Sequence, residues 1–286
     1  MNLPAGQTGP RRALFLSGGG AKGAFEAGVV LGLLERGYRF EFVAGISVWA
    51  LNAALVAQHD PGGLERAWRS IRGPGDIYRY WPGRGVLDWL GLVNGLYSTA
   101  PLRRLVEAHL DPAKIAGSSV ALHLGATNLR TGEIEYGGNR RPDRLGSLAD
   151  WILASAAFPP VFPPVKIGTD WYADGGLRSL VPLMDFLEPQ EPASWDEAHV
   201  VLCARRGLAP MVNRPRGVLG LGGRALAILS DEVLQGDLRH CRQEARPILL
   251  YEPPPGLDMP GSLDFDPRTL RHQLDAGWHA KARPLD

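Results

Sequence analysis

A strand, a tight turn and a helix follow one another twice within the first 60 residues. The apolar run 13–16 leads through three consecutive glycines at 18–20 into a segment whose apolar residues recur at helical spacing. Gly37 then stands where a left-handed cap residue ends helices, and 40–45 and 48–58 predict a second strand and a second helix. Such alternation requires crossover connections, so it predicts a mainly parallel sheet with helices on both faces, an α/β fold.

Further elements follow the same logic. The group Asp60-Pro61-Gly62-Gly63 is expected to break the chain after the second helix. Pro159 and Pro160 are expected to stop a short helix at 151–158. The remaining expected elements are strands at 119–128, 132–138 and 199–204, a pair of strands around the turn at 168–170, and a helix at 224–241.

Composition limits the class of protein. At 286 residues, with 45% hydrophobic and 21% charged residues, the chain is long enough for one large globular domain. We expect a flexible tail at 1–11 and a single domain at 12–286, with 197–286 as a C-terminal extension packed on the same domain. The sequence does not determine the oligomeric state.

Charge and cysteine content bear on partners and location. The formal net charge of +1 gives no general attraction for nucleic acid, which is not expected as a partner. Cys203 and Cys241 are far apart and form no CxxC motif, which favours a reduced compartment. No stretch reaches the roughly 18 apolar residues of a membrane helix, so we expect a cytoplasmic protein, at most peripheral to the membrane.

Two segments leave alternatives open. The aromatic-rich segment 73–98 is either a mobile cap over a site or a connection packed on the core. The segment 205–246 carries eight arginines against four acidic residues, which fits either a solvated helix face or a peripheral contact with a membrane.

Ser47 is the candidate nucleophile. It lies in the pentad Gly45-Ile46-Ser47-Val48-Trp49, between an expected buried strand and a helix, where a sharp turn exposes a hydroxyl at the carboxyl end of a sheet. On the pentad alone, the more common role of helix N-cap is favoured for this serine.

The glycines Gly18, Gly19 and Gly20 can supply the backbone N–H groups of an oxyanion hole. Gly18, Gly20 and Gly23 also fit the Gly-x-Gly-x-x-Gly fingerprint of dinucleotide-binding proteins. That fingerprint expects an acidic residue at the end of the second strand, where this chain has Gly45 and Ser47. A nucleotide-binding protein is therefore the second, weaker alternative.

Asp174 is the candidate base. It ends an expected strand and precedes Gly175 and Gly176, which permit a sharp turn that would present the carboxylate at the edge of the sheet. The seven histidines are scattered, and none stands in a pattern that makes it the partner of Ser47. A DGG triplet taken alone is more often only a turn.

The combination of these blocks resembles the patatin-like phospholipase family. The matching segments are SGGGAKG at 17–23, GISVW with its ALNAA continuation, ASAAFPPVFPPV at 154–165 and DGG at 174–176, and the resemblance covers roughly 12–187. It implies a three-layer α/β/α sandwich and a lipid acyl hydrolase acting on phospholipids or other long-chain esters, with no metal and no cofactor.

The same resemblance assigns roles to residues. It makes Ser47 the nucleophile and Asp174 the base of a dyad without histidine, places the oxyanion hole at 18–20, and puts Lys22 at the family's basic position. Gly23, Gly45, Trp49, Gly175 and Gly176 complete the motifs.

Two departures from the family pattern stand out. Trp49 replaces the glycine that usually closes the pentad, so we expect the helix to be spread from the strand or the indole to point outward. Trp49 thereby motivates the first alternative, a catalytically impaired relative that binds lipid or a partner. After Gly176 the chain reads LRSLVP, without the family's frequent Asn before the proline, which predicts a different support for the aspartate loop.

Overall fold

The computed structural model describes residues 9–80, 94–141, 146–186, 195–208, 210–211, 215–257, 259 and 261–285. Residues 1–8 of the expected tail and 81–93 of the aromatic segment, with Trp81 and Trp89, lie outside this part of the chain.

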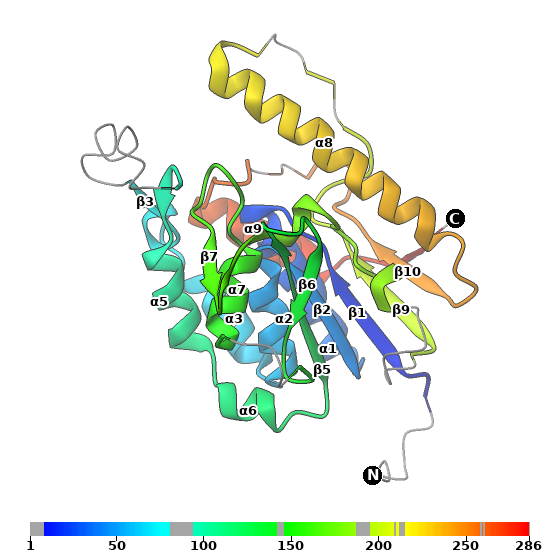
Figure 1. The fold of residues 1–286 in the computed structure, drawn as a ribbon. Helices are drawn as coiled ribbons and strands as arrows, with labels where there is room; N and C mark the ends of the chain where they lie inside the picture. The colour runs from blue at the N-terminus through cyan, green and yellow to red at the C-terminus, as the bar shows by residue number, and fades with distance from the viewer. Residues whose placement is uncertain are drawn as a thin grey trace.

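A nine-stranded mixed sheet forms the centre of the protein (Figure 1). Its order is β11-β10-β9-β1-β2-β5-β8-β7, and β6 also pairs with β5. The neighbours from β10 to β5 are parallel, whereas β6, β7, β8 and β11 join by antiparallel pairing. The strands are β1 (Arg12–Leu16), β2 (Phe42–Ile46), β5 (Ala121–Asn128), β6 (Ile134–Gly137), β7 (Val165–Ile167), β8 (Asp170–Asp174), β9 (Glu197–Val201), β10 (Ile248–Tyr251) and β11 (Arg283–Pro284).

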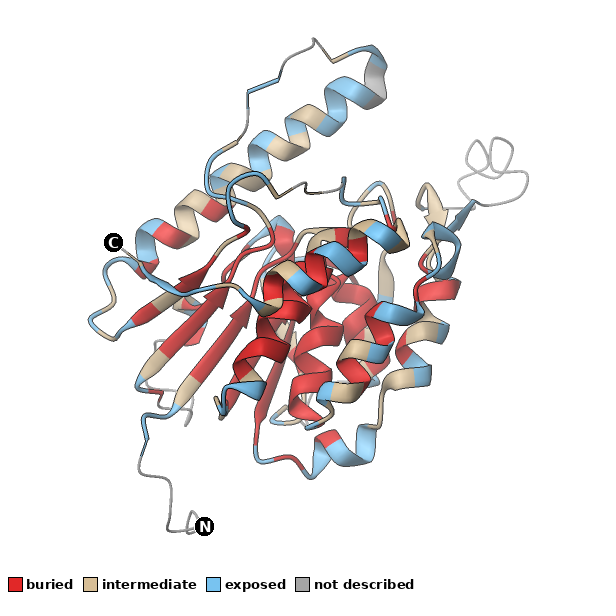
Figure 2. Ribbon diagram, turned by 180° about the vertical axis from the view of Figure 1, so that it is seen from behind, coloured by how far each residue is buried: buried red, intermediate tan, exposed pale blue. Residues whose placement is uncertain are grey.

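Helices cover both faces of the sheet, and Figure 2 shows the more densely covered face. That face carries α1 (Gly23–Glu35), α2 (Trp49–Ala57), α3 (Pro61–Ser70), α5 (Ala100–His109), α7 (Leu148–Ser155) and α9 (Pro267–Trp278). The opposite face carries the carboxyl-terminal part of α8 (Gly217–Cys241) and the 3-10 helix η4 (Met184–Phe186). The other elements are α6 (Pro112–Ala116), the hairpin β3 (Arg79–Tyr80) and β4 (Tyr97–Ser98), and the 3-10 helices η1 (Gly20–Lys22), η2 (Pro74–Asp76) and η3 (Gly175–Leu177).

The side chains of the central strand β1 alternate between the two hydrophobic clusters, one on each face of the sheet. Leu14 and Leu16 belong to the cluster under α1 and α2, whereas Ala13 and Phe15 belong to the cluster under α8. Successive side chains of a strand point to opposite faces, so a strand covered on both sides is apolar throughout. The predicted three-layer α/β/α sandwich with a mainly parallel sheet is therefore confirmed.

The expected break after the second helix is confirmed, since α2 ends at Ala57. The group Asp60-Pro61-Gly62-Gly63 also begins α3, a helix that was not predicted from the sequence, because Asp60 caps this helix by accepting a hydrogen bond from the Gly63 N–H. Proline at the first helical position lacks only an N–H that would be unpaired there in any case. The same residues that break a helix in its interior thus start one here.

The C-terminal part of the chain continues the same sheet and helix layer. Strands β9 and β10 extend the sheet beyond β1, and α9 packs against α1 so closely that a Cβ on Gly28 would lie 2.0 Å from Leu274 O. None of the helices in the described ranges combines the length and apolar character needed to cross a bilayer.

The topology brings three loops to one place. From β1 the chain proceeds through β2 to β5 on one side, whereas β9 and β10 lie on the other side of β1. Loops diverge at the carboxyl ends of parallel strands where the strand order reverses, and ligands bind in the space this creates. The loops that follow β1, β2 and β9 meet at this point.

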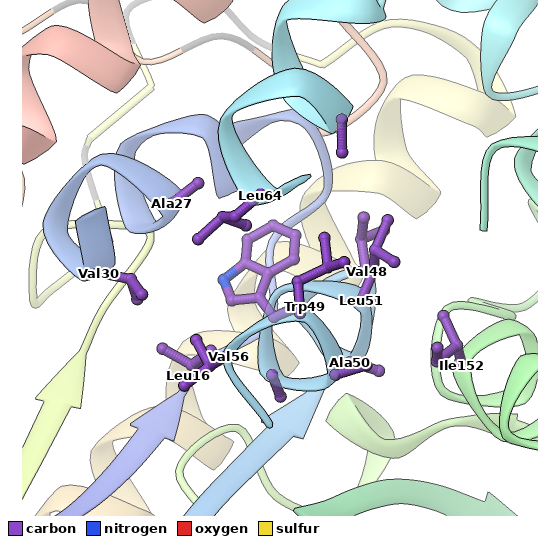
Figure 3. Close-up of a cluster of buried hydrophobic side chains, with 14 of the residues drawn as sticks. Leu16, Ala27, Val30, Val48, Trp49, Ala50, Leu51, Val56, Leu64 and Ile152 are labelled. Carbon is purple, nitrogen blue, oxygen red and sulfur yellow. The ribbon is translucent and has the colours of Figure 1, made fainter. Parts of the chain in front are cut away.

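Trp49 is fully buried at the start of α2 (Figure 3). Its indole points into the helical layer, where it lies among Ala27 and Val30 of α1 and Leu64 of α3. The predicted outward orientation is therefore wrong. The strand and the helix are not spread either, since a Cβ on Gly45 would lie 2.8 Å from Ala53 Cβ.

This packing yields a prediction for Trp49→Gly. Because the substitution removes a fully buried indole and leaves a cavity, we expect it to lower the free energy of unfolding by about 3 to 5 kcal/mol, without increasing ester hydrolysis. Urea unfolding measures the loss, and Trp171→Gly, on a tryptophan that is 46% exposed, is the matched control. A stable Trp49→Gly variant with a higher esterase rate would instead support the impaired-enzyme alternative.

Candidate active site

Ser47 occupies a strained turn between β2 and α2. Its φ of 65° lies in the left-handed region, which non-glycine residues rarely adopt. The backbone N–H of Ser47 donates to Ser155 Oγ at 2.8 Å, and the Ser155 hydroxyl donates to Gly125 O at 2.6 Å. These bonds connect the turn to α7 and β5, and so hold Ser47 in its left-handed conformation.

Gly45 explains why the turn can be so tight. A Cβ at this position would lie 2.8 Å from both Ala53 Cβ and Trp49 O, so a larger residue would push α2 away from β2. Within the pentad, the residue that needs the absence of a side chain for close contact with α2 is therefore the first glycine, Gly45. Position 49, which faces α1 and α3, accommodates a large side chain.

Asp174 faces Ser47 from the end of β8. Ser47 Oγ donates to Asp174 Oδ2 at 2.7 Å, across a separation of 127 positions in the sequence. The second carboxyl oxygen, Oδ1, accepts a hydrogen bond from the Gly176 N–H at 2.8 Å. Thr127 Oγ1 donates to the Asp174 carbonyl at 2.9 Å, and the Asp174 N–H donates to Ala157 O at 3.0 Å. Backbone and side chain of Asp174 are therefore both fixed.

Burial sets the protonation of this carboxyl group. Removal from water raises the pKa of Asp174 to about 7, against the opposing effect of the hydrogen bonds from Ser47 and Gly176. Near neutral pH both protonation states are thus populated. A group with this pKa can accept a proton from a hydroxyl and later return it.

The glycine loop lies directly beside the hydroxyl of Ser47. A Cβ on Gly18 would lie 3.0 Å from Ser47 Cβ and 3.7 Å from Ser47 Oγ, and Gly20 has a φ of +67°. Within the described ranges, the N–H groups at 18–20 donate to no other residue, whereas Ser17 N–H donates to Val201 O and Ala21 N–H to Ser262 O. Unpaired N–H groups beside a hydroxyl can stabilise a developing oxyanion.

The segment that follows β9 supplies one wall of this loop. The thiol of Cys203 donates to Gly18 O, and a Cβ on Gly19 would lie 2.2 Å from Cys203 Sγ. Burial raises the pKa of Cys203 to about 11, although the nearby ammonium group of Lys22 favours the thiolate. Cys203 is therefore a thiol that supports the loop, and Lys22 lies at the edge of the same loop.

The glycines at 23, 175 and 176 keep the surrounding backbones close. A Cβ on Gly23 would lie 2.7 Å from the Trp68 ring, and one on Gly175 would lie 2.6 Å from Gly125 O. Gly176 contributes the N–H that binds Asp174. Each of these glycines of the predicted motifs thus stands where a side chain would crowd a neighbouring group.

The loop after Gly176 is held by α8. The Asp237 carboxylate accepts hydrogen bonds from the N–H groups of Leu180 and Val181 at 2.7 and 2.8 Å, and from the Ser179 hydroxyl at 3.2 Å. Leu180 Cδ2 lies 3.2 Å from the position of a Cβ on Gly18, so this side chain covers the glycine loop. Asp237 therefore supports the loop that follows Gly176 in this chain.

The aromatic segment packs on the core where it is described. The Tyr78 ring lies 4.7 Å from that of Tyr97 and 5.9 Å from that of Phe162, and the Tyr78 hydroxyl donates to Leu263 O at 2.8 Å. Tyr80 is exposed. These residues favour the packed connection over a mobile cap for the ends of the segment.

A narrow apolar hollow lies among α2, α3 and α5. Val48, which follows Ser47, is one of its lining residues. The other lining residues are Leu51, Ala67, Trp68, Ile71, Ile77, Leu102, Leu105 and Phe265. The lining includes no charged side chain, but the volume of about 10 Å³ is only about that of one water molecule, so the hollow is too small for an acyl chain.

Sequence reasoning missed Ser155 and Asp237. Ser155 lies in the quoted segment ASAAFPP, but nothing local distinguishes its hydroxyl from that of any serine in a helix. Asp237 lies within a charged helical stretch, where an acidic residue ordinarily faces water. Only the pairing of distant segments reveals either contact. In the part of the chain that the structure describes, no histidine hydrogen bonds to Ser47 or Asp174, and His123 is buried with its pKa lowered to about 3 by loss of solvent.

A sheet covered by helices on both faces, with a serine at a strand–helix elbow beside a glycine loop, is the arrangement of serine hydrolases built on α/β folds. The model of the family Patatin-like phospholipase matches residues 14–187, so this chain belongs to the patatin-like phospholipase family. Membership of this family suggests lipid acyl hydrolase activity.

Similar proteins include an uncharacterized NTE family protein of Mycobacterium tuberculosis, 28% identical over 180 residues, and the uncharacterized protein YqhO of Bacillus subtilis, 29% identical over 195 residues. The alignments cover 62% of this chain and 46% of the mycobacterial protein, and 59% of this chain and 65% of YqhO. The chain thus spans about half the length of the mycobacterial relative. VipD of Legionella pneumophila is similar in structure, with 18% identity and a TM-score of 0.42 over 67% of this chain and 50% of VipD.

The raised pKa of Asp174 predicts how an Asp174→Asn variant depends on pH. Unfolding lowers the pKa from about 7 to the ordinary value near 4, so the natural protein loses stability as pH rises through this interval. We expect the free energy of unfolding of the variant, relative to the natural protein, to increase between about pH 5 and about pH 8.

Chemical unfolding at both pH values measures this difference. Asp170→Asn, on the same strand, is the control, because the hydrogen bond and charge of Arg130 lower the pKa of Asp170 to about 2. That carboxylate stays ionised across the whole interval, so its removal should give no such pH dependence. A pH-independent difference for Asp174→Asn would show that the carboxyl group is not neutralised by burial.

Proposed function

We propose that this protein is a serine acyl hydrolase that cleaves carboxylic esters of lipids through Ser47 and Asp174. The observation that carries the proposal is the hydrogen bond of 2.7 Å between Ser47 Oγ and the buried Asp174 carboxylate, made from a turn with positive φ. A helix N-cap serine has no need of either feature, since its hydroxyl binds the backbone of its own helix.

The first half-reaction forms an acyl-enzyme. Ser47 Oγ attacks the ester carbonyl carbon while Asp174 accepts the hydroxyl proton. The carbonyl oxygen becomes an oxyanion, which the N–H groups of the loop at 18–20 bind. Collapse of this intermediate breaks the bond to the alcohol oxygen, and the alcohol leaves with the proton held by Asp174.

The second half-reaction returns the enzyme to its starting state. Asp174 takes a proton from a water molecule as the water attacks the acyl carbon bound to Ser47. The same N–H groups bind the second oxyanion, and the fatty acid leaves as Ser47 regains its proton from Asp174. Every proton moves between Asp174 and a reacting oxygen, so the cycle requires no histidine.

Lipid esters are favoured as substrates by family membership, which suggests lipid acyl hydrolase activity. The head group and the length of the acyl chain are not part of the proposal.

Each of the two rival functions requires a local geometry that differs from the one observed around Gly18 and Ser47. A nucleotide-binding protein needs open space before Gly18 for the diphosphate, but the Ser47 side chain lies there. An impaired relative requires a displaced elbow, but the contact between Ser47 and Asp174 is short. These two observations favour the acyl hydrolase over both alternatives.

Ser47→Ala tests the nucleophile. We expect the variant to lose hydrolysis of a chromogenic acyl ester by about 10⁴-fold or more, together with covalent labelling by a fluorophosphonate, because both need the hydroxyl. Ser118→Ala, a buried serine whose hydroxyl contacts Val120 and His59 rather than the site, is the matched control and should keep most of the labelling. Equal labelling of the natural protein and Ser47→Ala would exclude Ser47 as the nucleophile.

The pH dependence of kcat/KM tests the base. Only the ionised carboxylate can accept the serine proton, so kcat/KM should rise as pH increases through about 7 and then reach a plateau. The measurement uses an uncharged ester between about pH 5 and about pH 9, with buffer controls. A rate that stays constant across this interval would argue against Asp174 as the base.

A further inference from the structure

The amino-terminal half of α8 extends beyond the body of the protein. Figure 1 shows this helix above the carboxyl ends of the central strands, with one end projecting away from the sheet. Its buried side chains are Leu234, Leu238 and Cys241, all near the carboxyl-terminal end. None of the described side chains from 217 to 233 is buried, and Figure 2 shows them as exposed or intermediate.

An apolar face of this projecting half is left uncovered. Leu221 and Leu229 are each 63% exposed and Ile228 is 50% exposed. At 3.6 residues per turn, these three side chains lie on the side of the helix opposite the buried residues at 234, 238 and 241. The helix is therefore anchored by one face at its carboxyl-terminal end and presents an apolar face to solvent at the other.

Charge identifies the partner that this surface fits. The sequence from 198 to 230 contains no Asp and no Glu, although the formal net charge of the whole chain is only +1, and Asp231 and Glu232 follow directly after it in α8. It contains the arginines at 205, 206, 214, 216 and 224, of which Arg206 pairs with Glu252. A helix with exposed leucines and neighbouring arginines matches the interface of an anionic bilayer, which offers acyl chains to the leucines and phosphates to the arginines.

We infer that the amino-terminal half of α8 docks this protein onto the surface of an anionic lipid bilayer. The anchored end supports this placement, since Asp237 of α8 binds the loop at 179–181 that follows the candidate catalytic Asp174. Docking through α8 would bring the candidate active site to the bilayer. The inference deepens the proposed function, and rests on it for the purpose of docking, but binding itself requires no catalysis.

A second copy of the chain fits this surface less well. Two copies that met through the same face of α8 would bring two sets of arginines together, and the first acidic residues after 198 are Asp231 and Glu232, of which Glu232 pairs with Arg239. Like charges at a contact oppose association. An anionic bilayer does not bring this repulsion.

The test measures cosedimentation of the Ser47→Ala protein with vesicles, so that hydrolysis does not alter the lipid. We expect binding to vesicles of phosphatidylcholine and phosphatidylglycerol, weaker binding at high salt, and little binding to phosphatidylcholine alone. Adding Leu221→Glu and Leu229→Glu should weaken binding by about tenfold or more. Arg104→Glu, on an exposed position of α5, changes the net charge by the same amount and should have little effect.

Each outcome decides the inference. Equal binding of the double variant and the Arg104→Glu control, or no binding by the parent protein, would overturn it, as would a dimer in light scattering that the double variant abolishes. Hydrolysis of a short soluble ester, measured with Ser47 intact, should not change in the double variant. Loss of hydrolysis in every protein, with vesicle binding kept, would refute the proposed function but not the docking surface.

Discussion

The left-handed backbone conformation of Ser47 is the constraint on which the candidate site depends. A non-glycine residue in this region costs of the order of 1 to 3 kcal/mol and persists only where its surroundings impose it. Here the bond from Ser47 N–H to Ser155 and the tight contact of Gly45 with α2 impose it together. Trp49 fills the space behind the turn. The strain at one residue is thus balanced by packing and hydrogen bonds from the surrounding elements.

Burial and hydrogen bonding act in opposite directions on Asp174. Loss of solvent favours the neutral acid, whereas the hydrogen bonds from Ser47 and Gly176 favour the carboxylate. Burial without these bonds would leave a carboxyl group that is protonated at neutral pH and cannot accept a proton. The backbone of Asp174, fixed by Thr127 and Ala157, keeps the carboxyl group in place as its charge changes.

Much of the fold follows from local sequence, since alternating strands and helices predicted the parallel sheet. The pairing of Ser47 with Asp174, which the structure brings together, was implied by the family resemblance and not by either motif alone. Long-range contacts could not be predicted in this way. The bond between Ser47 and Ser155 joins residues 108 positions apart, and the direction of the Trp49 indole depends on helices that the pentad does not specify. The helix α3 was not predicted, because the residue types that mark a break, Asp60 and Pro61, also cap and begin a helix.

Strand β9 has a consequence for any attempt to shorten this protein. The family match ends at residue 187, but β9 pairs with the whole length of β1, from Arg12 to Leu16. A fragment that stopped at 187 would turn the central strand of the sheet into an open edge, with unpaired backbone groups available to another chain. It would also lose Cys203 from beside the glycine loop. The boundary of the family's sequence pattern is therefore not a boundary at which this molecule can be cut.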